Sequence, residues 1–222
     1  MRDTIASLSL LGAGIASDDA AWIERLAPHP VGPDASLLPP ILRRRTSIAT
    51  RLAIAAAGRA CAVAGVDPAT VATIFCSEAG EIQITDRLCR AIARSEFPLS
   101  PTAFHNSVHN TALGYWSIVT GNMLPAQAMA ADGEELLAMG LLEARCQLAA
   151  GETSVLLVLY DESPPPAMVP DCAMSNLAVA LLVAAADHPA ARAAIDLVDA
   201  GDDDFSRQTP VAQALPLAML AL

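Results

Sequence analysis

Two histidines and a serine lie close together near the middle of the chain. His105 and His109 are four residues apart, with Ser107 between them. This spacing places two imidazole rings on one face of a helix, where they can ligate zinc, and a serine near a histidine suggests nucleophilic catalysis. The sequence lacks the glutamate of HExxH and the GxSxG of a hydrolase elbow. We expect no metal site, and Ser107 with His105 or His109 stays an alternative nucleophile–base pair.

A second candidate is the turn that contains Asp132, Gly133 and Glu134. A strand that turns sharply into a helix is where elbow nucleophiles lie, because the helix amides there stabilise an anion and lower the pKa of a thiol. No cysteine or serine occupies this turn. Asp132 and Glu135 instead have the spacing of a capping box, with aspartate as the cap and glutamate as the third helical residue. The residues favour an ordinary capped helix over a catalytic role.

Charge excludes several functional classes. The net charge is −11, and all 13 basic residues are arginine. Without lysine the chain has no Schiff-base chemistry and no P-loop, and an acidic chain is a poor candidate for nucleic-acid binding. Arg43, Arg44 and Arg45 form a basic run that is distinctive in this acidic surrounding. Such a run is more often simply solvated, and the alternative is a docking patch for an acidic partner.

Cysteine spacing and hydropathy indicate the compartment. The five cysteines are scattered without a CxxC pair, which is typical of free, buried thiols in a reducing cytosol. Prolines and polar residues interrupt the longest uncharged stretch, 97–131, and the other apolar runs are shorter than the roughly 18–20 residues of a membrane span. We expect a cytoplasmic protein with no membrane span and no cofactor.

Apolar runs and helical patterns alternate along the chain. Strands are expected at 4–11, 70–76, 153–160, 177–186 and 194–198, and helices at 17–26, 47–64, 81–94, 109–120 and 132–150. The last two strands are joined by a short loop, which predicts an antiparallel pair. This pattern predicts an α/β fold with a mixed sheet covered on both faces. We expect one domain over residues 1–200, followed by a loose tail over 201–222 whose apolar end can dock on the body.

The order of these elements resembles that of β-ketoacyl synthases. The residues that carry the likeness are Pro98–Phe104, Asn106–Asn110, Gly114, Ser117-Ile118, Gly121, Cys76–Glu81 and Leu157–Asp161. The chain is most similar to the short, chain-length-factor-like members found with aryl polyene and other type II polyketide or fatty-acid ketosynthases. The resemblance covers most of residues 1–200. It implies one half of a thiolase-like fold, with a mixed, mostly buried sheet and helices on both faces.

The departures from this family determine the expected function. The nucleophilic cysteine of condensing synthases aligns near Gly133, where neither glycine nor the flanking Asp132 and Glu134 can form a thioester. The two catalytic histidines lie in a second half that 222 residues are too few to contain. The resemblance thus implies a catalytically inactive partner that forms a heterodimer with an active β-ketoacyl synthase and shapes its acyl tunnel. The alternative is a stand-alone acyltransferase or thioester hydrolase that uses Ser107 with His105 or His109.

The resemblance also implies roles for individual residues. The partner interface is expected at Phe104, His105, Asn106, Ser107, His109 and Asn110. Bulky side chains that set the depth of the acyl tunnel are expected at Tyr115, Trp116 and Met129. The acyl carrier protein would meet this chain indirectly, through the ketosynthase, with Arg43, Arg44 and Arg45 as the docking patch.

Overall fold

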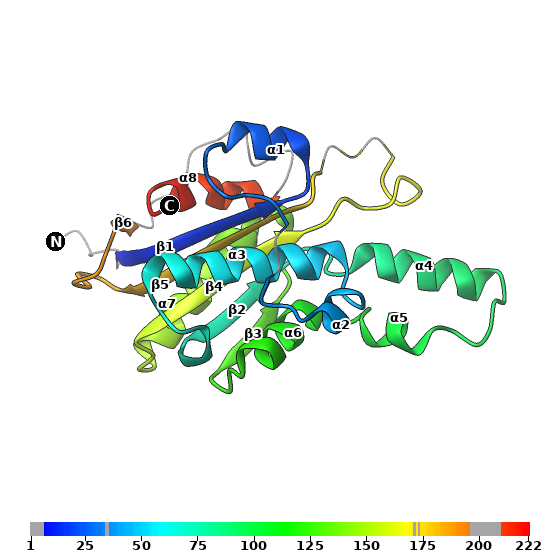
Figure 1. Cartoon of the computed structure of the whole chain (residues 1–222), viewed down its shortest axis with the longest axis horizontal. Helices are drawn as coiled ribbons and strands as arrows, with labels where there is room; N and C mark the ends of the chain where they lie inside the picture. Colours follow the sequence, from blue (N-terminus) through cyan, green and yellow to red (C-terminus); the bar gives the residue numbers. More distant parts are fainter. Residues whose placement is uncertain (1–6, 34–35, 171, 173, 196–209) are drawn as a thin grey trace.

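The computed structural model describes residues 7–33, 36–170, 172, 174–195 and 210–222. Within these residues six strands form one sheet in the order β3-β2-β4-β5-β1-β6 (Figure 1). The strands are β1 (Leu8–Ser17), β2 (Ala72–Cys76), β3 (Ala126–Met129), β4 (Ser154–Asp161), β5 (Leu177–Ala185) and β6 (Ala193–Ile195). The helices are α1 (Ala20–Arg25), α2 (Pro40–Arg43), α3 (Ile48–Ala64), α4 (Ile82–Ala93), α5 (Pro101–His105), α6 (Thr111–Thr120), α7 (Leu136–Ala149) and α8 (Leu215–Met219), with short 3-10 turns η1 (Pro68–Thr70), η2 (Gly133–Glu135) and η3 (Pro210–Ala214).

The sheet is mixed, as the sequence predicts. β2 pairs in parallel with β3 and β4, whereas β5 is antiparallel to both β4 and β1. The expected pairing of the last two strands is wrong, because β6 pairs with β1 instead of β5. Both edges of β5 are already hydrogen-bonded, so the chain must continue to the free edge of β1. Residues 196–198 of that expected strand lie outside the described residues.

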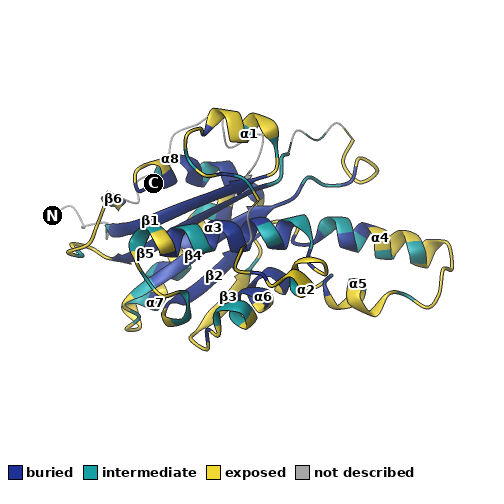
Figure 2. Ribbon diagram, in the orientation of Figure 1, coloured by how far each residue is buried: buried dark blue, intermediate teal, exposed yellow. Residues whose placement is uncertain are grey.

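Helices cover both faces of the sheet. α3 and α6 pack on one face, and α7, η3 and α8 pack on the other. Figure 2 shows the central strands as buried, and in β4 and β5 only one terminal residue of each strand is not buried. Burial on both faces explains why β4 and β5 are almost continuously apolar in sequence instead of alternating with polar residues. The expected α/β class, with a mostly buried sheet between helices, is confirmed.

The first strand does not end at its glycines, as the sequence suggested. It runs on to Ser17, and a Cβ added at Gly12 would lie 2.6 Å from the carbonyl oxygen of Ala60 in α3. Gly14 faces the backbone of the same helix one turn earlier. The glycines therefore allow α3, which is rich in alanine, to lie directly against the strand.

Two further segments complete the fold. The apolar end of the chain packs on the body, since Val211, Leu215 and Ala218 are buried in the same cluster as residues of α7. Residues 201–209 of the expected tail lie outside the described part. At the opposite end of the sheet, α4 and α5 project from the body as an arm (Figure 1). We call residues 81–110 the arm.

Candidate functional site

The turn between β3 and α7 contains Asp132, Gly133 and Glu134, the residues predicted from the sequence to align with the nucleophile of condensing synthases. The Gly133 N–H donates to Oδ1 of Asp132 at 2.8 Å, and the Glu135 N–H donates to the carbonyl oxygen of Asp132 at 2.8 Å. The expected capping box does not form, because the aspartate carboxylate caps Gly133 and the chain first makes the 3-10 turn η2. The side chain of Glu134 lies outside what the structure describes. The turn presents a carboxylate and no group that can be acylated.

Acidic side chains surround this turn. The carboxyl ends of the parallel strands β2, β3 and β4 meet at one edge of the sheet, which brings Glu78 and Asp161 to the side of Asp132. Asp161 is buried and accepts the Ser77 hydroxyl at 2.6 Å and the backbone N–H groups of Glu78 and Ala79. Burial raises the pKa of Asp161 to about 6, and it also raises the pKa of Glu78, assisted by the charge of Asp132.

The nearest buried thiol is unsuited to replace the missing nucleophile. Cys76 ends β2, and burial raises its pKa to about 12, with a further contribution from the negative charges of Asp161 and Glu143. A thiol attacks as the thiolate, and neighbouring carboxylates disfavour that form. Burial likewise raises the pKa of Cys61 to about 12. Neither buried cysteine is activated for covalent catalysis.

The segment from Phe104 to Asn110 connects the arm to the body. Asn106 is buried, where its amide donates to the carbonyl oxygen of Arg45 at 2.6 Å and accepts the Tyr115 hydroxyl at 3.2 Å. Nε2 of His109 donates to the carbonyl oxygen of Ser77 at 2.9 Å. Phe104 and the neighbouring His105 and Asn110 are exposed. The sequence-predicted interface residues therefore divide into buried anchors and an exposed apolar and polar surface.

The alternative nucleophile is not assembled. The Ser107 hydroxyl donates to the carbonyl oxygen of Phe104 at 2.9 Å. Among the described residues no hydrogen bond joins Ser107 to His105 or His109. A serine needs a base in direct contact to become nucleophilic, so this geometry gives the hydrolase alternative no support. The described residues also contain no cluster of three or more side chains that could hold a metal ion.

The three expected tunnel residues lie at different depths. Trp116 is 0% exposed, and its ring lies 6.2 Å from that of Phe75 in the core between α6 and the sheet. Tyr115 is also buried, with its hydroxyl on Asn106. Met129 is half-buried at the end of β3, directly before the turn that holds Asp132. Of these three, Met129 is the one that reaches the surface near the site.

Exposed apolar side chains lie on α5, on α6, between these two helices, and on the loop that leads from α6 to the edge strand β3. Phe104 is 66% exposed, Ile118 67% and Met123 93%, and Val108 and Leu124 are also exposed. β3 is the terminal strand of the sheet, pairs only with β2 and is exposed along most of its length. We call this combination of β3, Phe104, Val108, Ile118, Met123 and Leu124 the edge surface.

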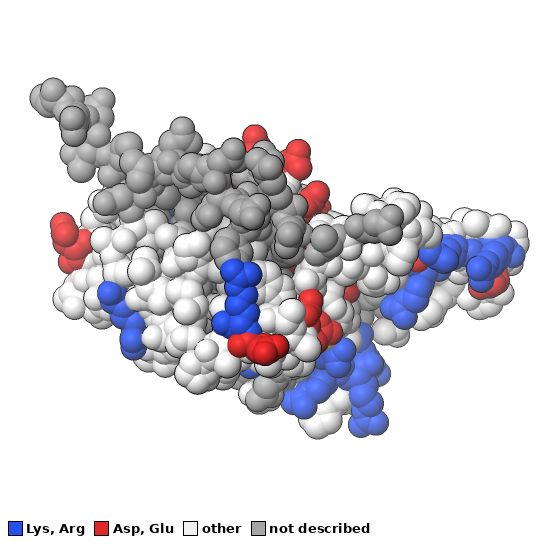
Figure 3. Space-filling model, turned by 90° about the horizontal axis from the view of Figure 1, so that it is seen from above, with Lys and Arg blue, Asp and Glu red and all other residues white. Residues whose placement is uncertain are grey.

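Exposed arginines lie on two elements at the arm end of the molecule. Arg43, Arg44 and Arg45 are exposed at the end of α2, where the Arg43 guanidinium donates to the carbonyl oxygen of Leu38 at 3.1 Å. Sequence reasoning missed a second group, which comprises Arg87 and Arg90 of α4 and Arg94 directly after this helix. Figure 3 shows basic side chains gathered toward this end. The spacing of three and four residues between these arginines places side chains on one helix face, and this spacing could have predicted the second basic group from the sequence.

The fold is that of one half of a thiolase-like protein, with a mixed six-stranded sheet between helices that matches solved ketosynthase structures. A family model described as the N-terminal domain of β-ketoacyl synthase matches residues 18–219. The chain therefore belongs to the β-ketoacyl synthase N-terminal domain family. A comparison with curated proteins finds no match. In the part of the chain that the structure describes, no helix is both long and apolar enough to span a membrane.

Solved structures of ketosynthases share this fold. The complex of the ketosynthase ApeO with its chain length factor ApeC from Xenorhabdus doucetiae matches with 25% identity and a TM-score of 0.66, over 81% of this chain and 79% of that chain. The ishigamide ketosynthase/chain length factor matches with 15% identity and a TM-score of 0.62, over 82% and 62%. AntDE:AntF, a type II acyl-carrier protein in complex with its ketosynthase, matches with 15% identity and a TM-score of 0.61, over 82% and 64%. The last two matched chains are longer, and this chain spans less than two thirds of each.

Proposed function

We propose that this protein is a catalytically inactive ketosynthase-like subunit that pairs with an active β-ketoacyl synthase and shapes its acyl tunnel. The observation that carries the proposal is the β3–α7 turn, which holds Asp132 and Gly133 where a condensing enzyme carries its nucleophile. The Asp132 carboxylate already accepts the Gly133 N–H, and the surrounding carboxylates oppose a thiolate. The likeness to the ApeO–ApeC complex, whose second member is a chain length factor, supports this role in aryl polyene-like polyketide or fatty-acid biosynthesis.

The edge surface is the proposed site of pairing. A strand with one free edge offers unpaired backbone N–H and C=O groups to a partner strand, and β3 carries no charged side chain that would prevent this. Contiguous exposed apolar side chains mark protein interfaces. Asn106, through its bonds to Arg45 and Tyr115, fixes the chain that carries Phe104 and Val108. The six residues Phe104, His105, Asn106, Ser107, His109 and Asn110 therefore remain the proposed interface segment.

Met129 and Phe104 are the proposed contacts with the acyl chain. Met129 lies beside the turn that replaces the nucleophile, and Phe104 projects from α5 into solvent, where a partner's tunnel can receive it. Tyr115 and Trp116 lie behind them in the core, so we assign them a supporting role that fixes the position of α6. Smaller side chains at Met129 or Phe104 should leave a deeper tunnel and give longer products.

The arginines at the arm end are the proposed docking surface for the acyl carrier protein. Carrier proteins of this kind are acidic, and complementary charge mainly increases the rate of association. Arg43, Arg44 and Arg45 are exposed, and the α4 arginines extend the same positive surface. The AntDE:AntF structure contains an acyl-carrier protein together with its ketosynthase, which supports a carrier site on such a complex.

The test is to compare the chain alone with the chain in complex. Purified alone and incubated with acyl thioesters, the protein should show no covalent adduct by intact mass. Co-expressed with a co-encoded ketosynthase, it should co-purify, and carrier-dependent condensation should depend on the ketosynthase cysteine. An adduct on this chain, or condensation by this chain alone, would refute the proposal.

A matched pair of variants tests the interface. Met123→Asp places a charge on the edge surface and should weaken the affinity for the ketosynthase by about 30-fold or more. Val169→Asp changes an exposed apolar residue on the loop after β4, which lies away from β3 in Figure 1, and should leave the affinity unchanged. Affinities are measured by titration of the labelled subunit. Equal effects of the two variants would contradict the assignment of the edge surface.

A further inference from the structure

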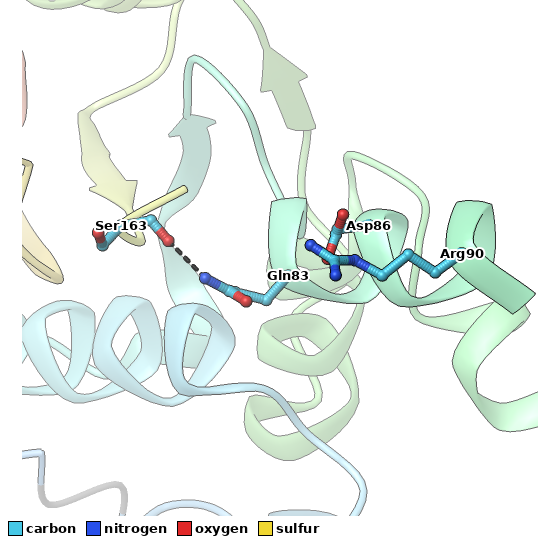
Figure 4. A network of polar contacts seen from close by, with 4 residues as sticks. All are labelled: Gln83, Asp86, Arg90 and Ser163. Carbon is cyan, nitrogen blue, oxygen red and sulfur yellow. Dashed lines mark hydrogen bonds and ion pairs between the residues drawn. The ribbon is translucent and has the colours of Figure 1, made fainter. Parts of the chain in front are cut away.

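The arm projects from the body and depends on a small root for its position. Most side chains along the outer part of α4 and along α5 are exposed (Figure 2). At the α4 end the root is formed by Glu81, which directly precedes the helix, and by Glu162, which directly follows β4. The Gln83 side chain donates to the carbonyl oxygen of Ser163 at 2.7 Å, as Figure 4 shows. The first turn of α4 is thus tied to the end of β4.

Each of the two glutamates has one carboxyl oxygen bonded and one without a partner. Oε1 of Glu81 accepts the Thr50 hydroxyl of α3 at 2.5 Å, and Oε1 of Glu162 accepts the Gln83 N–H at 3.0 Å. Both side chains are 1% exposed, and Oε2 of each is buried without a hydrogen-bond partner. Such buried, half-satisfied carboxyl groups require a physical explanation.

Among the described residues, neither glutamate takes part in an ion pair. Of the ion pairs found in this part of the chain, Arg90–Asp86 lies farther along α4 than Gln83 (Figure 4), and Arg94–Glu96 follows the end of that helix. The exposed Arg87 of α4 favours the charged form of both glutamates, whereas the negative charges of Glu81 and of Asp161 in β4 disfavour ionisation of Glu162.

The remaining neighbours are neutral or acidic. Ser47 and Thr50 of α3 supply hydroxyl groups to Glu81, and Tyr160 of β4 and Cys76 of β2 belong to the same electrostatic cluster. An ionised carboxylate that is buried without a counter-charge costs several kcal/mol, and the usual outcome is that the group takes up a proton.

We propose that Glu81 and Glu162 form a proton-dependent anchor, in which neutral carboxyl groups hold α4 against the sheet and their deprotonation loosens the arm. On opening, each carboxyl group releases its proton to solvent and becomes hydrated, so the open arm carries the negative charge that the closed root excludes. The anchor concerns the arm of this chain alone and does not depend on the proposed pairing with a ketosynthase.

The direction of the pH effect follows from the environment of the glutamates. Burial is the main cause that raises the pKa of Glu162 to about 7, and it also raises that of Glu81. In the open arm both groups return to the ordinary value near 4.5. The closed arm is therefore favoured at low pH. Opening becomes easier as the pH rises from about 4.5 to about 7 and changes little above that range.

Hydrogen exchange of the α4 amides measures this opening directly. The opening constant is obtained after correction for the intrinsic exchange rate. In the wild-type protein, deprotonation of Glu162 alone should increase this constant about 20-fold as the pH rises from 5.5 to 7.5. Exchange in β5 reports global unfolding for comparison. Glu162→Gln should reduce the increase, and the double variant Glu81→Gln/Glu162→Gln should abolish it and open less than wild type at pH 7.5. Glu24→Gln, at an exposed position on α1, should behave as wild type.

Two results would overturn the proposal. One is a wild-type opening constant that does not change between pH 5.5 and pH 7.5, a measurement that needs no variant to fold. The other is a double variant that keeps the full pH dependence, which would assign it to other groups. Because neither measurement uses a ketosynthase, failure of the anchor is distinguishable from failure of the proposed function.

Discussion

Replacing Trp116 distinguishes residues that stabilise the fold from residues of the proposed interface. Trp116 is fully buried on α6, and its ring lies against Phe75 at 6.2 Å with an interplanar angle of 46°. Phe104, which belongs to the same proposed site, is 66% exposed. We expect Trp116→Ala to act on the stability of the isolated chain, and Phe104→Ala to act on the complex.

The magnitude follows from burial and from one unsatisfied group. Truncating a buried tryptophan to alanine costs about 4 kcal/mol in the free energy of unfolding. The Trp116 indole N–H is buried without a hydrogen-bond partner, so removing it offsets about 1 kcal/mol of the loss in the free energy of unfolding. The net cost for Trp116→Ala is about 3 kcal/mol. Trp116→Phe keeps most of the ring and loses the unpaired N–H, and should cost less than about 1.5 kcal/mol.

Urea and thermal unfolding of the isolated chain measure these differences. Trp116→Ala should lower the Tm by about 6–12 °C, whereas Phe104→Ala should change the free energy of unfolding by less than about 0.5 kcal/mol. In the reconstituted pair, Phe104→Ala should lengthen the products. If Trp116→Ala is nearly as stable as wild type, or if Phe104→Ala destabilises the isolated chain as much, the assignment of core and surface is incorrect.

Three further outcomes are expected. Gly14→Ala should cost about 3 kcal/mol, because the new methyl group meets the backbone of α3, whereas Gly32→Ala has open space and should be neutral; urea titrations compare the two. Asp161, with a folded pKa of about 6, should lower the free energy of unfolding by up to about 3 kcal/mol as the pH rises from about 4 to 6, and Ser77→Ala should extend this fall to higher pH; a flat profile would contradict it. Arg44→Glu should slow carrier-dependent turnover and weaken its salt dependence without changing the Tm; unchanged kinetics would mean that the arginine is merely solvated.

Much of the fold was predictable because it depends on local patterns. A sheet covered by helices is predicted by the continuous apolar runs of β4 and β5 and by the alanine-rich sequence of α3. The pairing of β6 was not predictable, because it depends on β4 and β1 occupying both edges of β5, which leaves the outer edge of β1 for β6. The extension of β1 through Gly12 likewise depends on how closely α3 approaches, which is a property of two segments far apart in sequence.

The candidate site divides in the same way. The absence of a nucleophile at Asp132 and Gly133 is a fact of composition that the sequence alone settles. The hydrogen bond from Gly133 N–H to the Asp132 carboxylate, in place of a capping box, is decided by the 3-10 turn that joins β3 to α7. The different depths of Trp116 and Phe104 follow from how α6 packs on the sheet while α5 extends from it.

Composition, periodicity and the residues at the β3–α7 turn determined the α/β class, the family resemblance and the absence of a nucleophile, because each is encoded within a short stretch of chain. The tertiary structure decided which carboxyl groups are buried, which aromatic rings are exposed and which strand edge stays open. Those properties arise where distant segments meet, and the burial and electrostatics of a side chain depend on every segment packed around it.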